Sequence, residues 1–109
     1  MKKVVINTKK IKDRETFHSC FKEAFGFFDG YGMNMDAWID CLSYLRNPKE
    51  RMLKISLAPD ELLIIEITDT EDFAMRCKAQ LEELIESSSF VNQRFISKDG
   101  CPGIALVFL

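Results

Sequence analysis

Short apolar runs along this chain predict three buried strands. Residues 4–6, 62–67 and 104–107 are dominated by valine, isoleucine and leucine, and such runs are typical of strands covered by other elements. A weaker alternation at residues 54–57 predicts a short extra strand at an edge of the sheet. Residues 95–96 predict a further minor strand.

Between these runs the apolar positions take the spacing of amphipathic helices, at i, i+3, i+4 and i+7. The predicted stripes are Phe17, Cys20, Phe21, Ala24 and Phe25 in a first helix, Trp38, Cys41, Leu42 and Leu45 in a second, and Phe73, Ala74, Cys77, Leu81, Leu84 and Ile85 in a third. Asp13 and Asn34 are the predicted N-caps of the first two helices. Gly26 and Pro48 mark where these helices end.

The third helix has weaker signals at both ends. Residues 68–71 have the form of a capping box, with a threonine followed three positions later by a glutamate. The serines at residues 87–89 weaken the helical pattern. The resulting order of strand, two helices, strand, helix and strand predicts an α/β protein, because strands joined through helices form a parallel sheet with right-handed crossovers.

Length and composition limit the class of protein. A chain of 109 residues that is 47% apolar is expected to form a single domain over residues 1–109. No apolar run approaches the roughly 20 residues that span a bilayer, so we expect no membrane association. The first residues lack the pattern of a signal peptide, and the expected location is the cytoplasm.

Charge is distributed unevenly along the chain. Residues 1–27 carry a net charge of +4 and residues 60–86 a net charge of −7, although the whole chain carries only −2. An acidic segment of this kind disfavours binding to nucleic acid and suits a basic partner. Solvated helix and turn surface explains the same acids equally well.

The cysteines point to neither disulfides nor a metal site. Cys20, Cys41, Cys77 and Cys101 are irregularly spaced, and the single histidine, His18, completes no recognised zinc pattern with them. Three of the four lie on predicted apolar stripes, where a free cysteine behaves as a small hydrophobic residue. We expect four reduced thiols, no metal and no cofactor.

The most informative positions are two acids in the second helix. Asp36 and Asp40 are four residues apart, which places them on one helix face. No lysine or arginine lies within a turn of them along the sequence to offset their charge. Asp36 belongs to the first helical turn, where a negative charge interacts favourably with the helix dipole. Asp40 has no such local reason, and the pair suits a cationic partner.

The loop before this helix combines aromatic residues with glycines. Tyr31, Phe27 and Phe28 either fill the core beneath the loop or anchor an interface, where aromatic residues are enriched. Gly30 and Gly32 allow a positive φ or the close approach of another chain. Together with the two acids, these residues favour a protein-binding edge over a small-molecule pocket.

Catalytic interpretations of the same region are weak. General acid–base chemistry by Asp36 and Asp40 requires a cleft and carboxyls with separated pKa values, and no histidine or phosphate-binding loop lies near them in the sequence. Cys41 lacks a base, because His18 lies in the first helix and is predicted to be a helix-surface residue. We therefore expect that the chain is not an enzyme.

The stretch from residue 31 to residue 42 reads Tyr-Gly-x-Asn-apolar-Asp-Ala-x-x-Asp-Cys-Leu, which resembles the loop and second helix of the barstar family of ribonuclease inhibitors. The resemblance implies a two-layer fold with a three-stranded parallel sheet, to which the edge strand would be an addition. It also implies that the loop and the exposed helix face plug a ribonuclease active site. The implied partner-binding residues are Tyr31, Gly32, Asn34, Met35, Asp36, Ile39 and Asp40. Asp40 matches the family's dominant acidic contact, and Asp36 matches a second.

Some positions depart from the family pattern. Gly30 stands where the family has an aromatic residue, Met33 replaces a polar residue, and Ile39 stands where the family usually has tryptophan. Trp38 lies one position earlier, about 100° away around the helix. A further acidic contact of the family comes from the last long helix. The candidates for it are Glu82, Glu83 and Glu86.

The expected function is that of an intracellular inhibitor or toxin-immunity protein. Its expected partner is a basic ribonuclease of the extracellular or toxin type, occluded by the acidic helix face and the adjoining loop. The alternative is a non-catalytic regulatory module of the same fold that binds a different basic protein. A main binding partner that is a small basic nuclease would favour the first, and a basic regulator the second.

Overall fold

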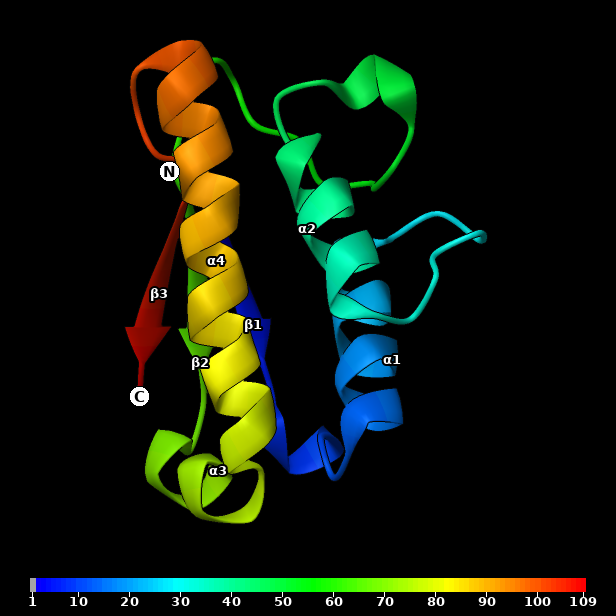
Figure 1. The fold of residues 1–109 in the computed structure, drawn as a ribbon, viewed down its shortest axis with the longest axis vertical. Coiled ribbons are helices and arrows are strands. Elements are labelled where there is room, and N and C mark those ends of the chain that lie inside the picture. Colours follow the sequence, from blue (N-terminus) through cyan, green and yellow to red (C-terminus); the bar gives the residue numbers. More distant parts are fainter. Residues whose placement is uncertain (1) are drawn as a thin grey trace.

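Helices pack on a small parallel sheet in this protein, whose computed structural model describes residues 2–109 (Figure 1). The strands are β1 (Lys2–Ile6), β2 (Leu63–Ile67) and β3 (Ile104–Phe108). The α-helices are α1 (Arg14–Phe25), α2 (Met35–Ser43), α3 (Thr70–Arg76) and α4 (Lys78–Asp99), and the 3-10 helices are η1 (Thr8–Lys10) and η2 (Pro48–Glu50). The predicted α/β class is confirmed.

The three strands run parallel in the order β1-β2-β3. Lys2 pairs with Leu63 at one end of the β1–β2 ladder and Ile6 pairs with Ile67 at the other. Along β2, Leu63, Ile65 and Ile67 are completely buried, whereas the residues between them are half-buried. The parallel sheet predicted from three apolar runs is therefore confirmed, with its most apolar strand at the centre.

The main helices surround a core rich in aromatic side chains. α1 packs against β1, α4 packs against β3, and α2 packs along α4. Figure 1 shows α2 beside α4, on the side away from β3. The largest side chains with less than 2% exposure are Trp38, Phe17, Phe21, Phe25 and Phe73. These residues belong to the predicted helix stripes, so the core faces of the helices follow from their apolar spacing.

The predicted edge strand at residues 54–57 is wrong. Only an isolated antiparallel bridge forms in this region, between Phe27 and Leu53. The backbone N–H of Lys54 donates to the carbonyls of Phe25 (3.2 Å) and Gly26 (3.0 Å) at the end of α1. The segment therefore satisfies terminal carbonyls of a helix, which lack partners within the helix itself, and adds no strand to the sheet.

The last long helix differs from its prediction in three ways. The helical stretch breaks at Cys77, which separates α3 from α4. α4 then continues through the serines at residues 87–89, because Ser87 and Ser88 are buried and their small side chains suit a packed position. It also includes residues 95–96, predicted as a strand, since Phe95 lies on its core face with 3% exposure.

Two predicted N-caps are confirmed and the capping box is wrong. The Asp13 side chain accepts a hydrogen bond from the Thr16 N–H, and the Asn34 side chain accepts one from the Ala37 N–H. The N-cap of α3 is instead Asp69, whose side chain makes no capping bond. The hydroxyl of Thr68 donates to the Ile6 carbonyl of β1, so it contributes to the sheet edge.

The ends of α1 and α2 are set by backbone conformation and hydrogen bonds, and α2 ends before Pro48. α1 ends at Gly26, as predicted, in the left-handed conformation with φ of +67°. α2 ends at Ser43, five residues before Pro48, because the N–H of Tyr44 donates to the carbonyls of Cys41 and Leu42. This bonding tightens the last turn before the proline is reached.

Arg46, just after α2, joins segments that are distant in the sequence. Its guanidinium donates to the Asp99 carboxylate (3.1 Å) and to the carbonyls of Glu61 (3.0 Å), Cys101 (3.3 Å) and Pro102 (2.9 Å). Its central carbon lies 4.7 Å from the centre of the Phe95 ring. The side chain of Arg46 is only 6% exposed. One side chain therefore holds the end of α2 against the end of α4 and the start of β3.

Candidate functional site

The loop before α2 rests on a buried tyrosine–histidine pair. Tyr31 is 5% exposed, and its hydroxyl oxygen lies 2.6 Å from Nδ1 of His18. His18 is completely buried, so its predicted place on the helix surface is wrong. The aromatic rings of Phe17 and Tyr31 lie against it, and burial lowers its pKa to about 4, with Arg14 adding to the effect. Burial also raises the pKa of Tyr31.

This burial decides between the two interpretations of the loop aromatics. Tyr31 and Phe27 fill the core, whereas Phe28 is 39% exposed. The ring of Phe28 lies over Gly30 and occupies the space that a Cβ there would need. Gly30, where the family pattern has an aromatic residue, thus allows the neighbouring Phe28 to cover the loop. Tyr31 positions the loop from within, and its side chain offers little surface to a partner.

α2 presents its two acids to solvent, as the helical spacing predicts. Asp36 and Asp40 are both exposed, and Ile39 between them is half-buried. Asn34 holds the start of the helix through the bond from Ala37 N–H to its Oδ1, at 2.8 Å. Trp38 has no exposed surface, so it does not replace the interface tryptophan of the family pattern.

α4 supplies the opposite wall of a shallow groove beside these acids. The groove has a volume of about 480 Å³ and is lined by Arg14, Asn34, Met35, Asp36, Ile39, Glu83, Glu86, Ser87 and Phe90. Four of the seven predicted site residues therefore lie together. Of the three acids proposed on the last helix, Glu83 and Glu86 reach the groove, whereas Glu82 lies near Lys78, with 3.9 Å between their charged groups.

Asp40 has a counter-ion that its sequence neighbours do not reveal. Nη1 of Arg94 donates to Oδ1 of Asp40 at 3.0 Å and to the Ser43 hydroxyl at 3.1 Å. The side chains of Asp40 and Arg94 are 58% and 54% exposed. The expectation that Asp40 lacks a cation nearby is therefore wrong in three dimensions, because α4 brings one from 54 residues away.

Sequence reasoning missed Phe90, Arg94 and Arg14 as site residues. Glu83, Glu86, Phe90 and Arg94 follow one another at intervals of three and four residues, which places them on one face of α4. Phe90 is 50% exposed although it is aromatic. Exposed aromatic residues beside charged ones are typical of interfaces, and this stripe was the signal available in the sequence.

The chemistry around α2 does not suit catalysis by Cys41. The thiol is buried, and burial together with the charge of Asp40 raises its pKa to about 11. A thiol with this pKa is protonated at neutral pH, and the thiolate is the nucleophilic form. All four cysteines are free thiols in the structure. Within residues 2–109, no group of histidine, cysteine and acidic side chains is arranged to hold a metal ion.

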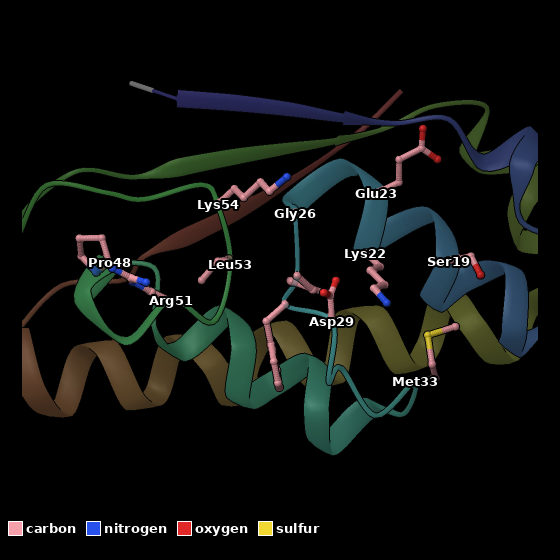
Figure 2. A pocket seen from close by; sticks show the side chains of 12 residues that line it. Ser19, Lys22, Glu23, Gly26, Asp29, Met33, Pro48, Arg51, Leu53 and Lys54 are labelled. Atoms are coloured by element: carbon pink, nitrogen blue, oxygen red, sulfur yellow. The ribbon is translucent and has the colours of Figure 1, made fainter.

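A larger hollow lies on the other side of the loop, between the end of α1 and residues 48–54 (Figure 2). Its volume is about 890 Å³. Cations from Lys22, Arg51 and Lys54 surround it together with the acids Glu23 and Asp29. None of the seven partner-binding residues implied by the family resemblance lines it, although Phe27 and Phe28 of the loop do. This hollow has mixed charge, whereas acids predominate in the groove between α2 and α4.

In the described part of the chain, residues 2–109, no helix combines the length and apolar character that crossing a bilayer requires. No curated protein matches the sequence. The sequence does match a protein family described as Barstar (barnase inhibitor), over residues 1–95. This match covers β1, β2, the whole of α2 and most of α4, including every residue that lines the groove. The chain therefore belongs to the Barstar family.

Proposed function

We propose that this protein inhibits a basic ribonuclease by binding across its active site. The observation that supports the proposal most strongly is the groove between α2 and α4, where Asp36 lies with Glu83 and Glu86, one helical turn from Asp40. A ribonuclease binds the phosphates of RNA through cationic side chains, so carboxylates placed at phosphate positions compete with RNA. Family membership supports the same function, since the family is described as an inhibitor of barnase.

The proposed inhibition is stoichiometric and requires no chemical step. Asp40 is the main contact in this proposal, because it is exposed and matches the family's dominant acidic contact. Asp36 adds a second negative charge, and Glu83 and Glu86 extend the acidic surface onto α4. Charge complementarity of this kind accelerates the encounter with a cationic partner and orients it. The long-range attraction is reduced by salt.

The remaining site residues shape the surface on which these acids lie. Met35 and Ile39 supply apolar area within the groove, and Asn34 holds the first turn of α2. Gly32 lets the loop backbone lie close to the Asn34 side chain, since a Cβ at residue 32 would lie 3.3 Å from the Asn34 amide nitrogen. Tyr31 is buried beneath the loop and positions it through its bond to His18.

Titration of barnase with the purified protein tests this function. We expect cleavage of a fluorogenic RNA substrate to fall linearly to an end point at one inhibitor per enzyme, and Asp40→Ala to abolish this sharp end point. Full RNA cleavage at a large excess of folded inhibitor would exclude barnase as its target. Affinity capture from the native host then separates the two candidate functions. A small basic nuclease as the main captured protein supports inhibition, and a basic protein without nuclease activity supports the regulatory alternative.

A further inference from the structure

Arg94 is placed where it can compete with a partner's cation for Asp40. Its Nη1 contacts only Oδ1 of that carboxylate, at 3.0 Å, and no contact from Arg94 reaches Oδ2. Both side chains are more than half exposed. An exposed pair of this kind contributes little to stability, so a competing cation can replace Arg94 at little cost.

On this face of α4 the residues before Arg94 are acidic or aromatic, and the cations Arg94 and Lys98 follow them. Glu83, Glu86 and Phe90 line the groove with Asp36, and Arg94 follows Phe90 by one turn. A cationic partner that reaches Asp40 therefore meets Arg94 at the same place. The partner's cation and the Arg94 guanidinium repel each other at this distance, so Arg94 must move away. The exposed pair between Arg94 and Asp40 is then broken.

We propose that Arg94 is an internal counter-ion that competes with a partner's cations for Asp40 and so lowers the affinity of the acidic surface for them, an inference that rests on the proposed function. A partner's cation that takes the place of Arg94 at Asp40 must break the existing pair. Arg94 is thus a repulsive element built beside an attractive one.

The test replaces Arg94 by methionine, which keeps most of the aliphatic stem and removes the charge. Lys98→Met is the matched control, because Lys98 lies one turn further along the exposed face of α4 and makes no bond with Asp40. Two probes are used in calorimetric titrations, barnase and a hexa-arginine peptide. Thermal melts establish that each variant is folded.

Arg94→Met is expected to bind both probes about threefold to tenfold more tightly than the unmodified protein, the range given by losing one exposed pair and one repulsive charge. Arg94→Lys is expected to stay near the unmodified value. Lys98→Met should produce a gain of less than about twofold, because its charge is further from Asp40 and is screened. In an Asp40→Asn background, the gain from Arg94→Met should shrink to that of Lys98→Met.

The two probes separate this inference from the proposed function. Tight binding of barnase with equal affinities for Arg94→Met and Lys98→Met overturns the role of Arg94 and leaves inhibition standing. Failure of barnase to bind, with the expected gain for hexa-arginine, overturns inhibition of a barnase-type enzyme and supports the counter-ion. Weaker binding by Arg94→Met, or no binding of either probe to any variant, overturns the inference.

Discussion

The loop from residue 27 to residue 34 separates two hollows that differ in charge. The larger hollow, about 890 Å³, mixes Lys22, Arg51 and Lys54 with two acids. The smaller groove, about 480 Å³, contains Asp36 and two glutamates against a single arginine. Under the proposed function the smaller of the two binds the partner, so size is a poor guide to the site. A surface on which one sign of charge predominates attracts an oppositely charged partner, whereas mixed charges largely cancel at a distance.

The backbone explains part of the difference in charge. The C-terminal end of α1 at Gly26 opens into the larger hollow, and the partial negative charge of a helix C-terminus favours cations there. Lysine and arginine at that position therefore have a structural reason. The groove lies instead at the N-terminal turn of α2, where the dipole suits Asp36. The dipole does not account for Asp40, Glu83 or Glu86, which the proposed function assigns to contacts with a partner.

The largest expected effect is a loss of binding affinity on removing Asp40, compared with no loss on removing an acid of the larger hollow. Asp40→Ala should weaken binding to the ribonuclease by about 2–5 kcal/mol, because the partner's cations lose their counter-charge on a desolvated surface. It should change the free energy of unfolding by less than about 1 kcal/mol, since its pair with Arg94 is exposed.

Calorimetric titration beside urea denaturation measures both quantities for Asp40→Ala. Asp29→Ala is the control, because it removes one exposed acid from the hollow on the other side of the loop, and its affinity should stay close to that of the unmodified protein. If Asp40→Ala lost stability and kept its affinity, Asp40 would be structural and the importance of the groove would fall.

Acid should destabilise the protein through His18, which is buried with Tyr31 beneath the loop between the two hollows. His18 has a pKa of about 4 in the folded protein against 6.5 when exposed, so the unfolded chain binds the proton more readily between these values. Stability is therefore complete above about pH 6.5 and falls as the pH approaches 4. At about 1.4 kcal/mol per unit of pKa, the loss is about 3 kcal/mol.

Urea denaturation between pH 7.5 and pH 4.5 measures this loss, with His18→Gln as the reference because it removes the only histidine and leaves every carboxyl in place. The unmodified protein should lose more stability over this range than the variant. Identical pH dependence in the two proteins would show that His18 does not contribute. A proton resonance of the single imidazole gives its pKa directly.

A smaller effect is expected at Asp36. Asp36→Ala should lower the free energy of unfolding by about 0.3–1 kcal/mol, because the first turn of α2 loses a charge that favours the helix dipole. Its cost in binding should be smaller than that of Asp40→Ala. Asp36→Asn serves as the companion variant, and a greater binding loss at Asp36 than at Asp40 would reverse the proposed ranking of the two acids.

The smallest effect is expected in the larger hollow. Lys22→Gln combined with Arg51→Gln should change affinity for the ribonuclease by less than about 0.5 kcal/mol, which is usual for surface substitutions away from a site. The same titration measures it. A clear loss of affinity would mean that the hollow takes part in binding and that the two regions act together.

The features that the sequence predicted best are those that depend on the spacing of neighbouring residues. The three strands follow from apolar runs, and the exposure of Asp36 and Asp40 follows from their separation by four residues along one helix. The caps at Asp13 and Asn34 depend on bonds within a single turn and were also predicted correctly. These features need no knowledge of distant parts of the chain.

The features that the sequence did not predict depend on tertiary contacts. The burial of His18 requires Tyr31 to fold over it. The pairing of Asp40 requires α4 to bring Arg94 beside α2. Residues 54–57 have strand-like alternation, but the end of α1 takes the N–H of Lys54. In each case a competing long-range contact prevailed over the local preference.

The contacts of Arg46 have a consequence for the entropy of binding. Because this side chain joins the end of α2 to Asp99 at the end of α4, the two helices that form the groove are tied together at one end before any partner arrives. A surface that is already ordered loses little conformational freedom on association. Less of the free energy of binding is therefore spent on ordering the helices that carry the acids.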